Sequence, residues 1–152
     1  MKIELQQKLY EKYPKIFAQK DLSITQTCMC WGVECGDGWY WLIDRLCSSI
    51  QNYCDNRNEE VRIRNEDRKD GARLHPTEEE MRVEASQVKE KFGRLRFYIN
   101  SSDDMVYGMI HLAEDMSYNI CEECGSTEDV KQTKGWITTL CSKCMKRLNK
   151  TS

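Results

Sequence analysis

The clearest periodic pattern in the chain is one apolar stripe between Trp39 and Cys54. Apolar residues recur there at i, i+3, i+4, i+7 and i+8, which is the spacing of one face of an α-helix. Asp37 precedes the stripe at the position of an N-cap, where a carboxylate accepts hydrogen bonds from free backbone N–H groups. The pattern predicts the main core helix, with Cys47 and Cys54 as small buried side chains on its apolar face.

Weaker patterns predict two more helices. Residues 2–13 have roughly helical apolar spacing, and Pro14 ends that helix. Residues 103–118 have a second clear apolar face and follow a cluster of turn and cap residues. Residues 22–36 have few helix signals, so we expect a loop or an extended chain there.

Residues 82–99 predict a β-hairpin. Its second strand alternates cleanly from Leu95 to Ile99, and Phe92-Gly93 forms the turn. The first strand has a less regular alternation of apolar and polar positions, so its bounds are less well defined.

The segment 55–80 differs from its surroundings because it is highly charged and has few apolar residues. This composition predicts a long polar loop between the core helix and the hairpin. We interpret His75 as an exposed histidine of that loop, without a functional role.

The composition favours a folded protein of the α+β class with a thin core. The 152 residues are enough for one domain, or for a small domain that carries a module. The net charge is only −2, and four Trp, seven Tyr and seven Met add apolar surface, so the combination typical of disorder is absent. Near-neutral charge also argues against a general nucleic-acid coat, which needs excess positive charge.

We expect a cytoplasmic protein. No apolar run approaches the roughly 20 residues that span a bilayer. The first residues also lack an apolar stretch of signal-peptide length. In such a reducing compartment, we expect the nine cysteines to remain free of disulfides.

The strongest chemical signal is a pair of Cys-x-x-Cys motifs near the carboxyl end. Cys121 and Cys124 form the first pair, Cys141 and Cys144 form the second, and 16 residues separate the pairs. Two residues between cysteines allow a tight knuckle to present both sulfurs to one ion, and two such pairs complete a tetrahedron. The spacing predicts one Zn²⁺ ion. Because four thiolates leave no open position for water or substrate, we expect a structural role.

The zinc module is expected to span residues 121–152, after a body of residues 1–120. Gly125 favours a closed knuckle, and residues 136–140 predict a strand of the following hairpin. A short helix then begins at the second cysteine pair. This order of knuckle, hairpin and helix predicts a treble-clef zinc finger, with a zinc ribbon as the alternative.

Two segments have the residue types of a binding surface. In residues 30–41, aromatic side chains offer flat walls and glycines permit a close backbone approach. The residues of this segment that we expect to contact a ligand or partner are Trp31, Glu34, Asp37 and Trp41. In the hairpin, cations and an aromatic ring on one face are typical of phosphate and base contacts, although a simple solvated strand face is an open alternative. The hairpin candidates are Arg94, Arg96 and Tyr98.

Catalytic signals are weaker. Tyr107, His111 and Asp115 share one helix face, and a His–Asp pair can act in general-base catalysis, but no nucleophile accompanies it. A second metal site would need a fourth ligand beside three further cysteines, and the sequence offers no evident one. These cysteines are Cys28, Cys30 and Cys35. The sequence therefore favours a binding protein over an enzyme.

Four short motifs stand out together. They are Trp31-Gly-Val-Glu-Cys-Gly-Asp-Gly-Trp39, Lys91-Phe-Gly-Arg-Leu-Arg-Phe-Tyr98, Cys121-Glu-Glu-Cys-Gly125 and Gly135-Trp-Ile-Thr-Thr-Leu-Cys141. As a set they resemble motifs of small uncharacterised proteins from phages and bacterial genomes. The resemblance covers most of residues 31–144 and implies no established activity. It implies a phage or prophage origin, and such small proteins often act on host machinery or defence by binding.

The sequence thus favours a small non-enzymatic zinc-containing binding protein. If it is phage encoded, it would act in the host cytoplasm on a host protein or on a nucleotide signal, for example against host defence. Two alternatives stay open. One is a nucleic-acid-binding regulator that uses the hairpin and the basic C-terminal residues. The other is a small hydrolase or nuclease that would use Glu34, Asp37, His111 and Asp115.

Overall fold

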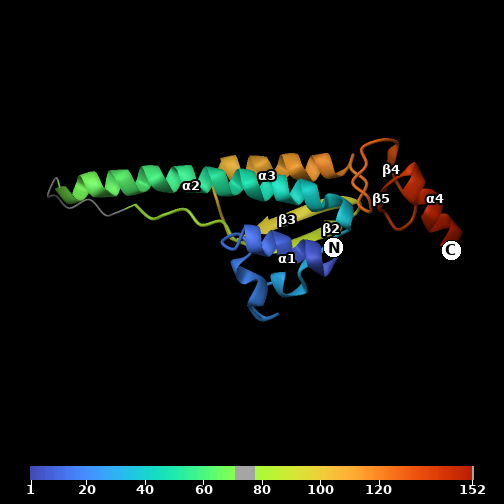
Figure 1. Cartoon of the computed structure of the whole chain (residues 1–152), viewed down its shortest axis with the longest axis horizontal. Helices are drawn as coiled ribbons and strands as arrows, with labels where there is room; N and C mark the ends of the chain where they lie inside the picture. Colours follow the sequence, from blue (N-terminus) through green and yellow to red (C-terminus); the bar gives the residue numbers. More distant parts are fainter. Residues whose placement is uncertain (71–77, 152) are drawn as a thin grey trace.

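The computed structural model describes residues 1–70 and 78–151, so His75 lies outside the described residues. Figure 1 shows an elongated molecule, with a long arm at one end, a body in the middle and a C-terminal module at the other end. The arm consists of the outer half of helix α2 and the extended segment 78–84, and the C-terminal module contains residues 121–151.

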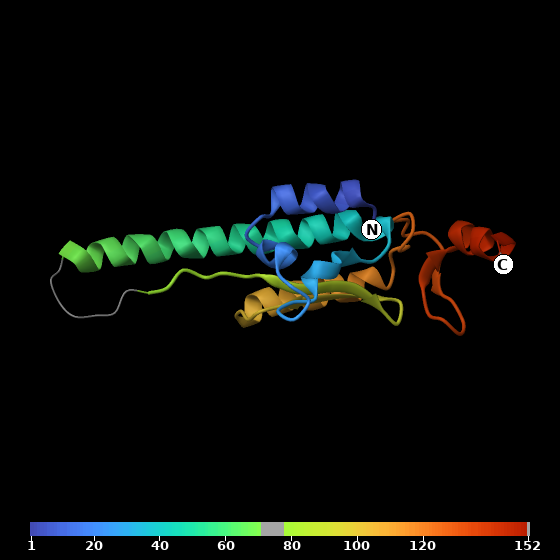
Figure 2. The same ribbon diagram turned by 90° about the horizontal axis from the view of Figure 1, so that it is seen from below.

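The body combines helices with a small sheet. In chain order, its elements are α1 (Ile3–Lys12), η1 (Ala18–Asp21), η2 (Met29–Trp31), β1 (Val33–Glu34), η3 (Asp37–Trp39), α2 (Tyr40–Asp70), β2 (Ala85–Lys91), β3 (Arg94–Ile99) and α3 (Asp104–Ser117). Helices α1 and α2 cover one face of the sheet, whereas α3 lies along β3 and packs against α2 (Figure 2). This mixture of helices and strands agrees with the α+β class that the sequence predicts.

Within the described residues, the sheet of the body has the strand order β1-β2-β3. Strands β2 and β3 form the expected antiparallel hairpin, whose turn residues Phe92 and Gly93 have φ angles of 54° and 75°. Strand β1 pairs in parallel with β2 and places Glu34 opposite Lys89. This pairing brings the aromatic-rich segment 30–41 next to the hairpin, although the two are far apart in the sequence.

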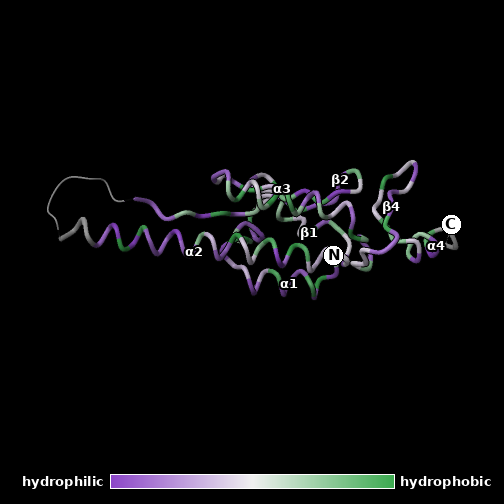
Figure 3. Tube along the Cα trace, turned by 90° about the horizontal axis from the view of Figure 1, so that it is seen from above, coloured by the Kyte–Doolittle hydropathy of each residue, from purple (hydrophilic) through white to green (hydrophobic). Residues whose placement is uncertain are grey.

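The core lies between the helices and the inner face of the sheet. Trp39, Ile43 and Cys47 have no exposed surface, which confirms the apolar stripe seen in the sequence. On the sheet, Val88 and Leu95 are equally buried. Figure 3 shows hydrophobic positions gathering where α1, α2 and the sheet overlap, whereas the outer half of α2 is mainly hydrophilic. Among the described helices, none combines the length and apolar character that crossing a bilayer requires.

Side chains satisfy backbone groups along both edges of the sheet. At the β1 edge, the backbone N–H of Val33 donates to Oε1 of Gln6 over 2.7 Å. At the β3 edge, the backbone N–H of Phe97 donates to Oε1 of Glu114 on α3 over 3.0 Å. Exposed strand edges are sites for unwanted pairing with other chains, so these contacts protect the sheet.

Asp37 does not cap helix α2, which corrects the prediction. The short helix η3 precedes α2, and its N-cap residue Gly36 makes no side-chain hydrogen bond. Oδ1 of Asp37 instead accepts a hydrogen bond from the backbone N–H of Lys2 over 2.7 Å. The chain enters α2 through a 3-10 turn, which directs this carboxylate toward the beginning of α1.

The prediction of a polar loop over residues 55–80 is wrong for the first part of this segment, because α2 continues to Asp70. Charged residues do not prevent a helix when acids and bases are three or four positions apart, as for Glu59 and Arg62, whose charged groups are 2.9 Å apart. The composition of this segment therefore reflects a solvated helix rather than a loop.

The C-terminal module contains β4 (Val130–Gln132), β5 (Thr139–Cys141) and α4 (Ser142–Thr151). Strands β4 and β5 pair in antiparallel fashion, with Val130 opposite Cys141. The first cysteine pair precedes this hairpin and the second pair lies where β5 passes into α4. The elements therefore follow the order that the sequence predicts.

Candidate metal centre and binding surface

The four cysteines of the two Cys-x-x-Cys motifs converge at one point. The sulfur atoms of Cys121, Cys124, Cys141 and Cys144 all lie within 4.8 Å of one another. The sulfurs of Cys124 and Cys141 are 3.7 Å apart. Four sulfurs placed about 2.3 Å from a central ion at tetrahedral corners would be about 3.8 Å apart. This cluster is therefore suited to hold a metal ion.

Backbone hydrogen bonds shape the first cysteine knuckle. The N–H of Gly125 donates to the carbonyl of Cys121, and the N–H of Cys121 donates to the carbonyl of Ser126, both over 2.8 Å. Gly125 has a φ angle of 77°, in the left-handed region that favours glycine. The glycine that follows the first pair thus has the role that the sequence predicts.

Neighbouring groups shift the pKa values of the second cysteine pair, Cys141 and Cys144. The backbone N–H of Cys144 lowers the pKa of Cys141 to about 7, which favours the thiolate that binds metals. Burial raises the pKa of Cys144. The Arg147 guanidinium donates to the sulfur of Cys144 over 2.9 Å, a charge-assisted contact that supports a thiolate and orients it.

The module is joined to the body through close backbone contacts. The N–H of Gly38 donates to the carbonyl of Glu122 over 2.7 Å, and the N–H of Gly36 donates to Oε1 of Glu122 over 2.9 Å. A Cβ atom at Gly38 would lie 2.2 Å from the carbonyl oxygen of Cys121. Gly36 and Gly38 therefore permit close approach to the cysteine knuckle.

Two side chains strengthen this junction. The indole N–H of Trp39 donates to the carbonyl of Ile120 over 2.8 Å. The hydroxyl of Thr139 in β5 donates to the carbonyl of Gly93, at the tip of the β2–β3 hairpin, over 2.6 Å. These hydrogen bonds thus join residues 120 and 139 to the aromatic segment and to the hairpin of the body.

A second candidate site is the outer face of the β1–β2–β3 sheet, opposite the helices. We define it by the side chains that point away from the core, which are Trp31, Glu34, Gln87, Lys89, Arg96 and Tyr98. Trp31 is 60% exposed and Tyr98 is 41% exposed. Tyr98 lies opposite Gln87 in the strand register, and Gln87 lines the same hollow as Trp31.

This hollow on the outer face has a volume of about 520 Å³. Its lining residues are Cys28, Trp31, Glu34, Gln87, Lys89 and Glu90. Within the described residues, the side chains of Glu34 and Lys89 make no hydrogen bond or short ion pair, so both charges are available to a ligand. The hollow therefore combines an aromatic wall, a neutral amide and charges of both signs.

The hairpin arginines are partly engaged by α3. Nη1 of Arg96 lies 3.1 Å from Oε2 of Glu114, and Nη1 of Arg94 lies 3.3 Å from Oδ1 of Asp115. The guanidinium of Arg94 also lies over the ring of Tyr118, 4.6 Å from its centroid. These cations thus hold β3 against α3.

The remaining predicted contact residues lie elsewhere. Asp37 is bound to Lys2 at the start of α1. Trp41 is exposed on α2 and lines an apolar groove between α2 and α3. Of the residues proposed from the sequence, only Trp31 and Glu34 line the hollow. Arg96 and Tyr98 share the outer sheet face with them but lie outside its lining, and Asp37, Trp41 and Arg94 also lie outside it.

The other sequence candidates for chemistry do not form a cluster. In the described part of the chain, the four C-terminal cysteines are the only group of three or more potential metal ligands in mutual reach. Cys30 donates to the carbonyl of Thr27 over 3.2 Å, and burial raises the pKa of Cys35 to about 12. His111 lies exposed on α3, one turn before Asp115.

Sequence reasoning missed two contributors to these sites. Gln87 lies on the outer sheet face because successive side chains of β2 point to opposite faces. The irregular apolar pattern of this strand in the sequence did not indicate which residues face outward. Arg147 lies one helical turn after Cys144, and that spacing on a helix is a signal that would have found it.

No protein-family model matches the chain, and comparisons with curated proteins and with solved structures give no significant match.

Proposed function

We propose that the four-cysteine cluster holds one structural Zn²⁺ ion in a treble-clef-like module. The supporting observations are that the four sulfurs lie within 4.8 Å of one another and that knuckle, hairpin and helix follow in this order. All four ligands are thiolates, which zinc prefers over harder cations. Elemental analysis of reduced, full-length protein should find one zinc per chain, and Cys124→Ser should lower that ratio. A Cys28→Ser control should keep the metal.

We further propose that the chain is a non-enzymatic binding protein whose ligand surface is the outer sheet face. The observation that carries this proposal is the parallel pairing of β1 with β2, which aligns Glu34 with Lys89 and joins the aromatic segment to the hairpin. Trp31 and Tyr98 on this face are both exposed, and Tyr98 lies opposite Gln87 in the strand register. Exposed aromatic groups beside free polar groups are typical of recognition surfaces.

The ligand class that fits this face best is a nucleotide. Trp31 and Tyr98 offer flat rings for base stacking, and Gln87 and Glu34 offer hydrogen bonds to a base edge. Lys89 supplies a cation for a phosphate. Because acidic groups share the face and the chain has a net charge of −2, a long polyphosphate strand fits less well than a single nucleotide or dinucleotide.

Trp31→Ala tests this proposal. Isothermal titration of the metal-loaded protein with nucleotides and cyclic dinucleotides should give binding to the unchanged chain. The variant should bind at least about fivefold more weakly, because stacking on an aromatic ring contributes about 1–3 kcal/mol per base. Trp41→Ala is the matched control, since Trp41 is 61% exposed and lies outside this face.

Two results would contradict the proposal. One is the absence of binding to any nucleotide in the panel. The other is an equal loss of affinity in Trp31→Ala and Trp41→Ala, which would move the ligand away from the outer sheet face. Unchanged circular dichroism in both variants serves as the folding control.

We also propose a phage or prophage origin, with the protein acting in the host cytoplasm. The support is the motif resemblance together with an accessible ligand surface. In this role the chain would bind a nucleotide signal of host defence and lower its free concentration. Expression in a bacterial host should then raise phage plating efficiency, and Trp31→Ala should remove that effect. Equal plating with and without the protein would contradict this role.

A second candidate function is nucleic-acid binding by the C-terminal module. Trp136 is 85% exposed near the tip of the β4–β5 hairpin, and Lys131 and Lys134 lie on the same hairpin. A single-stranded oligonucleotide should then bind with an affinity that falls steeply as salt rises. Trp136→Ala should weaken this binding, and Trp31→Ala should not.

A further inference from the structure

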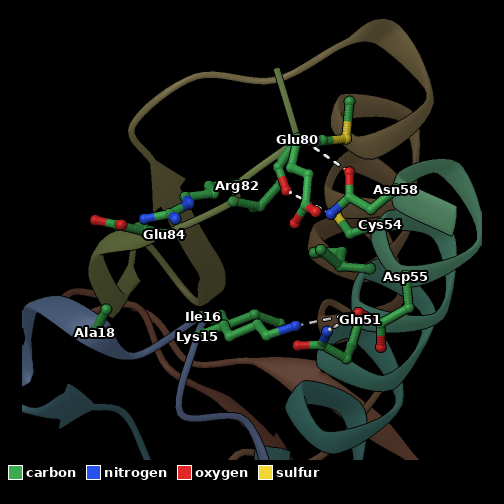
Figure 4. A pocket seen from close by; sticks show the side chains of 13 residues that line it. Lys15, Ile16, Ala18, Gln51, Cys54, Asp55, Asn58, Glu80, Arg82 and Glu84 are labelled. Atoms are coloured by element: carbon green, nitrogen blue, oxygen red, sulfur yellow. Dashed lines mark hydrogen bonds and ion pairs between the residues drawn. The ribbon is translucent and has the colours of Figure 1, made fainter. Parts of the chain in front are cut away.

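A cavity of about 310 Å³ lies at the root of the arm and shares no lining residue with the hollow of the outer sheet face. Figure 4 shows side chains from three segments around it: the chain at the start of η1, one side of α2, and the extended segment that leads into β2. Ligand pockets have volumes of about 300–1,000 Å³, so this cavity suits a ligand of amino-acid size.

The cavity has an apolar interior. Ile16, Ile50 and Val83 come from the three different segments and are buried, with exposed fractions of 2%, 0% and 4%. Buried aliphatic walls of this kind favour an aliphatic group of the ligand through the hydrophobic effect. Ala18 also lines the cavity and is exposed, which places it at the opening.

Charged groups of both signs surround the opening. They are Lys15, Asp55, Glu80, Arg82 and Glu84. The charge of the Glu80 carboxylate is already paired with Arg62, because its Oε1 accepts a hydrogen bond from Nε of Arg62 over 2.9 Å. Oε2 of Glu84 accepts a hydrogen bond from the neutral amide of Gln19 over 3.0 Å, so Glu84 keeps an uncompensated charge. Lys15, Arg82, Asp55 and Glu84 are the charged groups left to meet a ligand.

Of these remaining groups, Lys15 and Arg82 are weakly held or unengaged, whereas Oδ1 of Asp55 also accepts a hydrogen bond from Nε2 of Gln51 over 2.8 Å. Nζ of Lys15 is 3.4 Å from Oδ1 of Asp55, and both side chains are largely exposed, so solvent weakens this pair. Among the described residues, the guanidinium of Arg82 makes no hydrogen bond or short ion pair. A ligand carboxylate can therefore bind to Arg82 without breaking an existing contact.

We propose that this cavity binds a free α-amino acid with an aliphatic side chain. The carboxylate of the ligand meets the fork of Arg82, which suits bidentate contact. Its ammonium group meets Asp55 or Glu84, and its side chain packs against Ile16, Ile50 and Val83. A ligand with no net charge matches an opening where equal numbers of cations and acids are available.

The test uses isothermal titration and thermal unfolding of the metal-loaded full-length chain with L-leucine and L-methionine. Both amino acids should bind and raise the unfolding temperature. N-acetyl-leucine lacks the ammonium group and leucinamide lacks the carboxylate, so each should bind at least about tenfold more weakly.

Two variants locate the site. Arg82→Ala should weaken leucine binding about tenfold or more, because it removes the carboxylate partner. Ala18→Phe should block the opening and abolish binding while leaving every charged group in place. Lys8→Ala, which removes an exposed cation on α1 away from the cavity lining, is the matched control and should bind leucine normally.

The proposal is overturned if neither amino acid binds, or if N-acetyl-leucine and leucinamide both bind as tightly as leucine. Unchanged affinity in Ala18→Phe would also overturn it, because the ligand would then lie elsewhere. Nucleotide binding to the outer sheet face is measured separately, so failure of one proposal leaves the other standing.

Discussion

Single glycine residues set how closely the body approaches the cysteine knuckle. At Gly38, an added Cβ atom would lie 2.2 Å from the carbonyl oxygen of Cys121 and 2.4 Å from the backbone nitrogen of Gly125. Both neighbours are backbone atoms, so neither can rotate away. Gly38 is therefore required by packing rather than by a left-handed backbone conformation.

Gly38→Ala should destabilise the protein by about 3 kcal/mol, at the upper end of the usual range for overpacking. Urea denaturation measures this loss, and zinc release to a chelator should become faster because the knuckle shifts. Gly108→Ala is the control, since among the described residues no atom lies within 4 Å of its Cβ position. Because Gly108 lies inside α3, its replacement should stabilise the protein by about 0.5–1 kcal/mol. Equal effects of the two substitutions would contradict the packing argument.

Asp44 on α2 is a second residue whose contacts stabilise the folded protein. Burial alone would raise the pKa of Asp44, but hydrogen bonds from Lys12, Arg45 and Tyr13 outweigh it and hold the pKa below its usual value of 3.8. The Tyr13 hydroxyl donates to Oδ1 of Asp44 over 2.9 Å. As a result, this carboxylate joins the end of α1 to the first turns of α2.

Asp44→Asn should lower the free energy of unfolding by about 1–3 kcal/mol at pH 7, because hydrogen bonds to a charged partner are lost. The folded pKa is below the unfolded one, so the stabilisation is complete above pH 3.8 and declines as pH falls through the folded value. Urea denaturation at a series of pH values should show the two proteins converging under acid conditions. Both lose their metal there, so only their difference is compared. Asp55→Asn, at an exposed weak pair, should change stability by under about 1 kcal/mol.

At the scale of elements, the arm joins a helix to an extended chain through asparagine side chains. The amide of Asn58 donates to the carbonyl of Met81 over 3.0 Å and accepts from its N–H over 2.7 Å. The amide of Asn65 repeats both bonds with Glu78, over 3.1 and 3.0 Å. Seven helical residues rise about 10.5 Å. Three extended residues span about 10 Å, so the two spacings match.

Removing one amide should release only its own partner. In Asn58→Ala, hydrogen exchange at the Met81 amide should accelerate about tenfold, because its acceptor is lost. In Asn65→Ala, the same change should appear at Glu78. Asn56→Ala, on an exposed position of the same helix, is the control and should leave both amides protected. If Asn58→Ala left Met81 protected, the extended segment would be held by other contacts.

The elements that local patterns define were predicted well, and those that depend on distant partners were not. The apolar spacing from Trp39 to Cys54 is enough to predict which face of the helix is buried. The two-residue spacing within each Cys-x-x-Cys pair is enough to predict that both sulfurs can bind one ion. Strand β1 has only two residues and exists because β2 pairs with it. In the outer half of α2, up to residue 66, Val61 is the one buried apolar residue whose side chain the structure describes, so a search for apolar periodicity could not detect this part of the helix.

On the whole-molecule scale, the metal centre and the arm lie at opposite ends of the body (Figure 1). The module contacts the body through Gly36, Gly38 and Trp39, which form the entry to α2. Loss of the metal should therefore disturb the start of this helix as well as the module itself. The outer half of the same helix depends on its own contacts with the extended segment.

Chelation of the metal from reduced protein should unfold the module first, because structural zinc contributes much of the folding free energy of such small units. Hydrogen exchange should accelerate across residues 121–148 and at the Trp39 indole N–H, whose acceptor is the carbonyl of Ile120. The Met81 amide should keep its protection, because its partner Asn58 is in the arm. Metal-loaded Cys28→Ser protein should behave like the unchanged chain. Full protection of residues 121–148 after complete metal removal would show that the cysteine cluster is not what holds the module together.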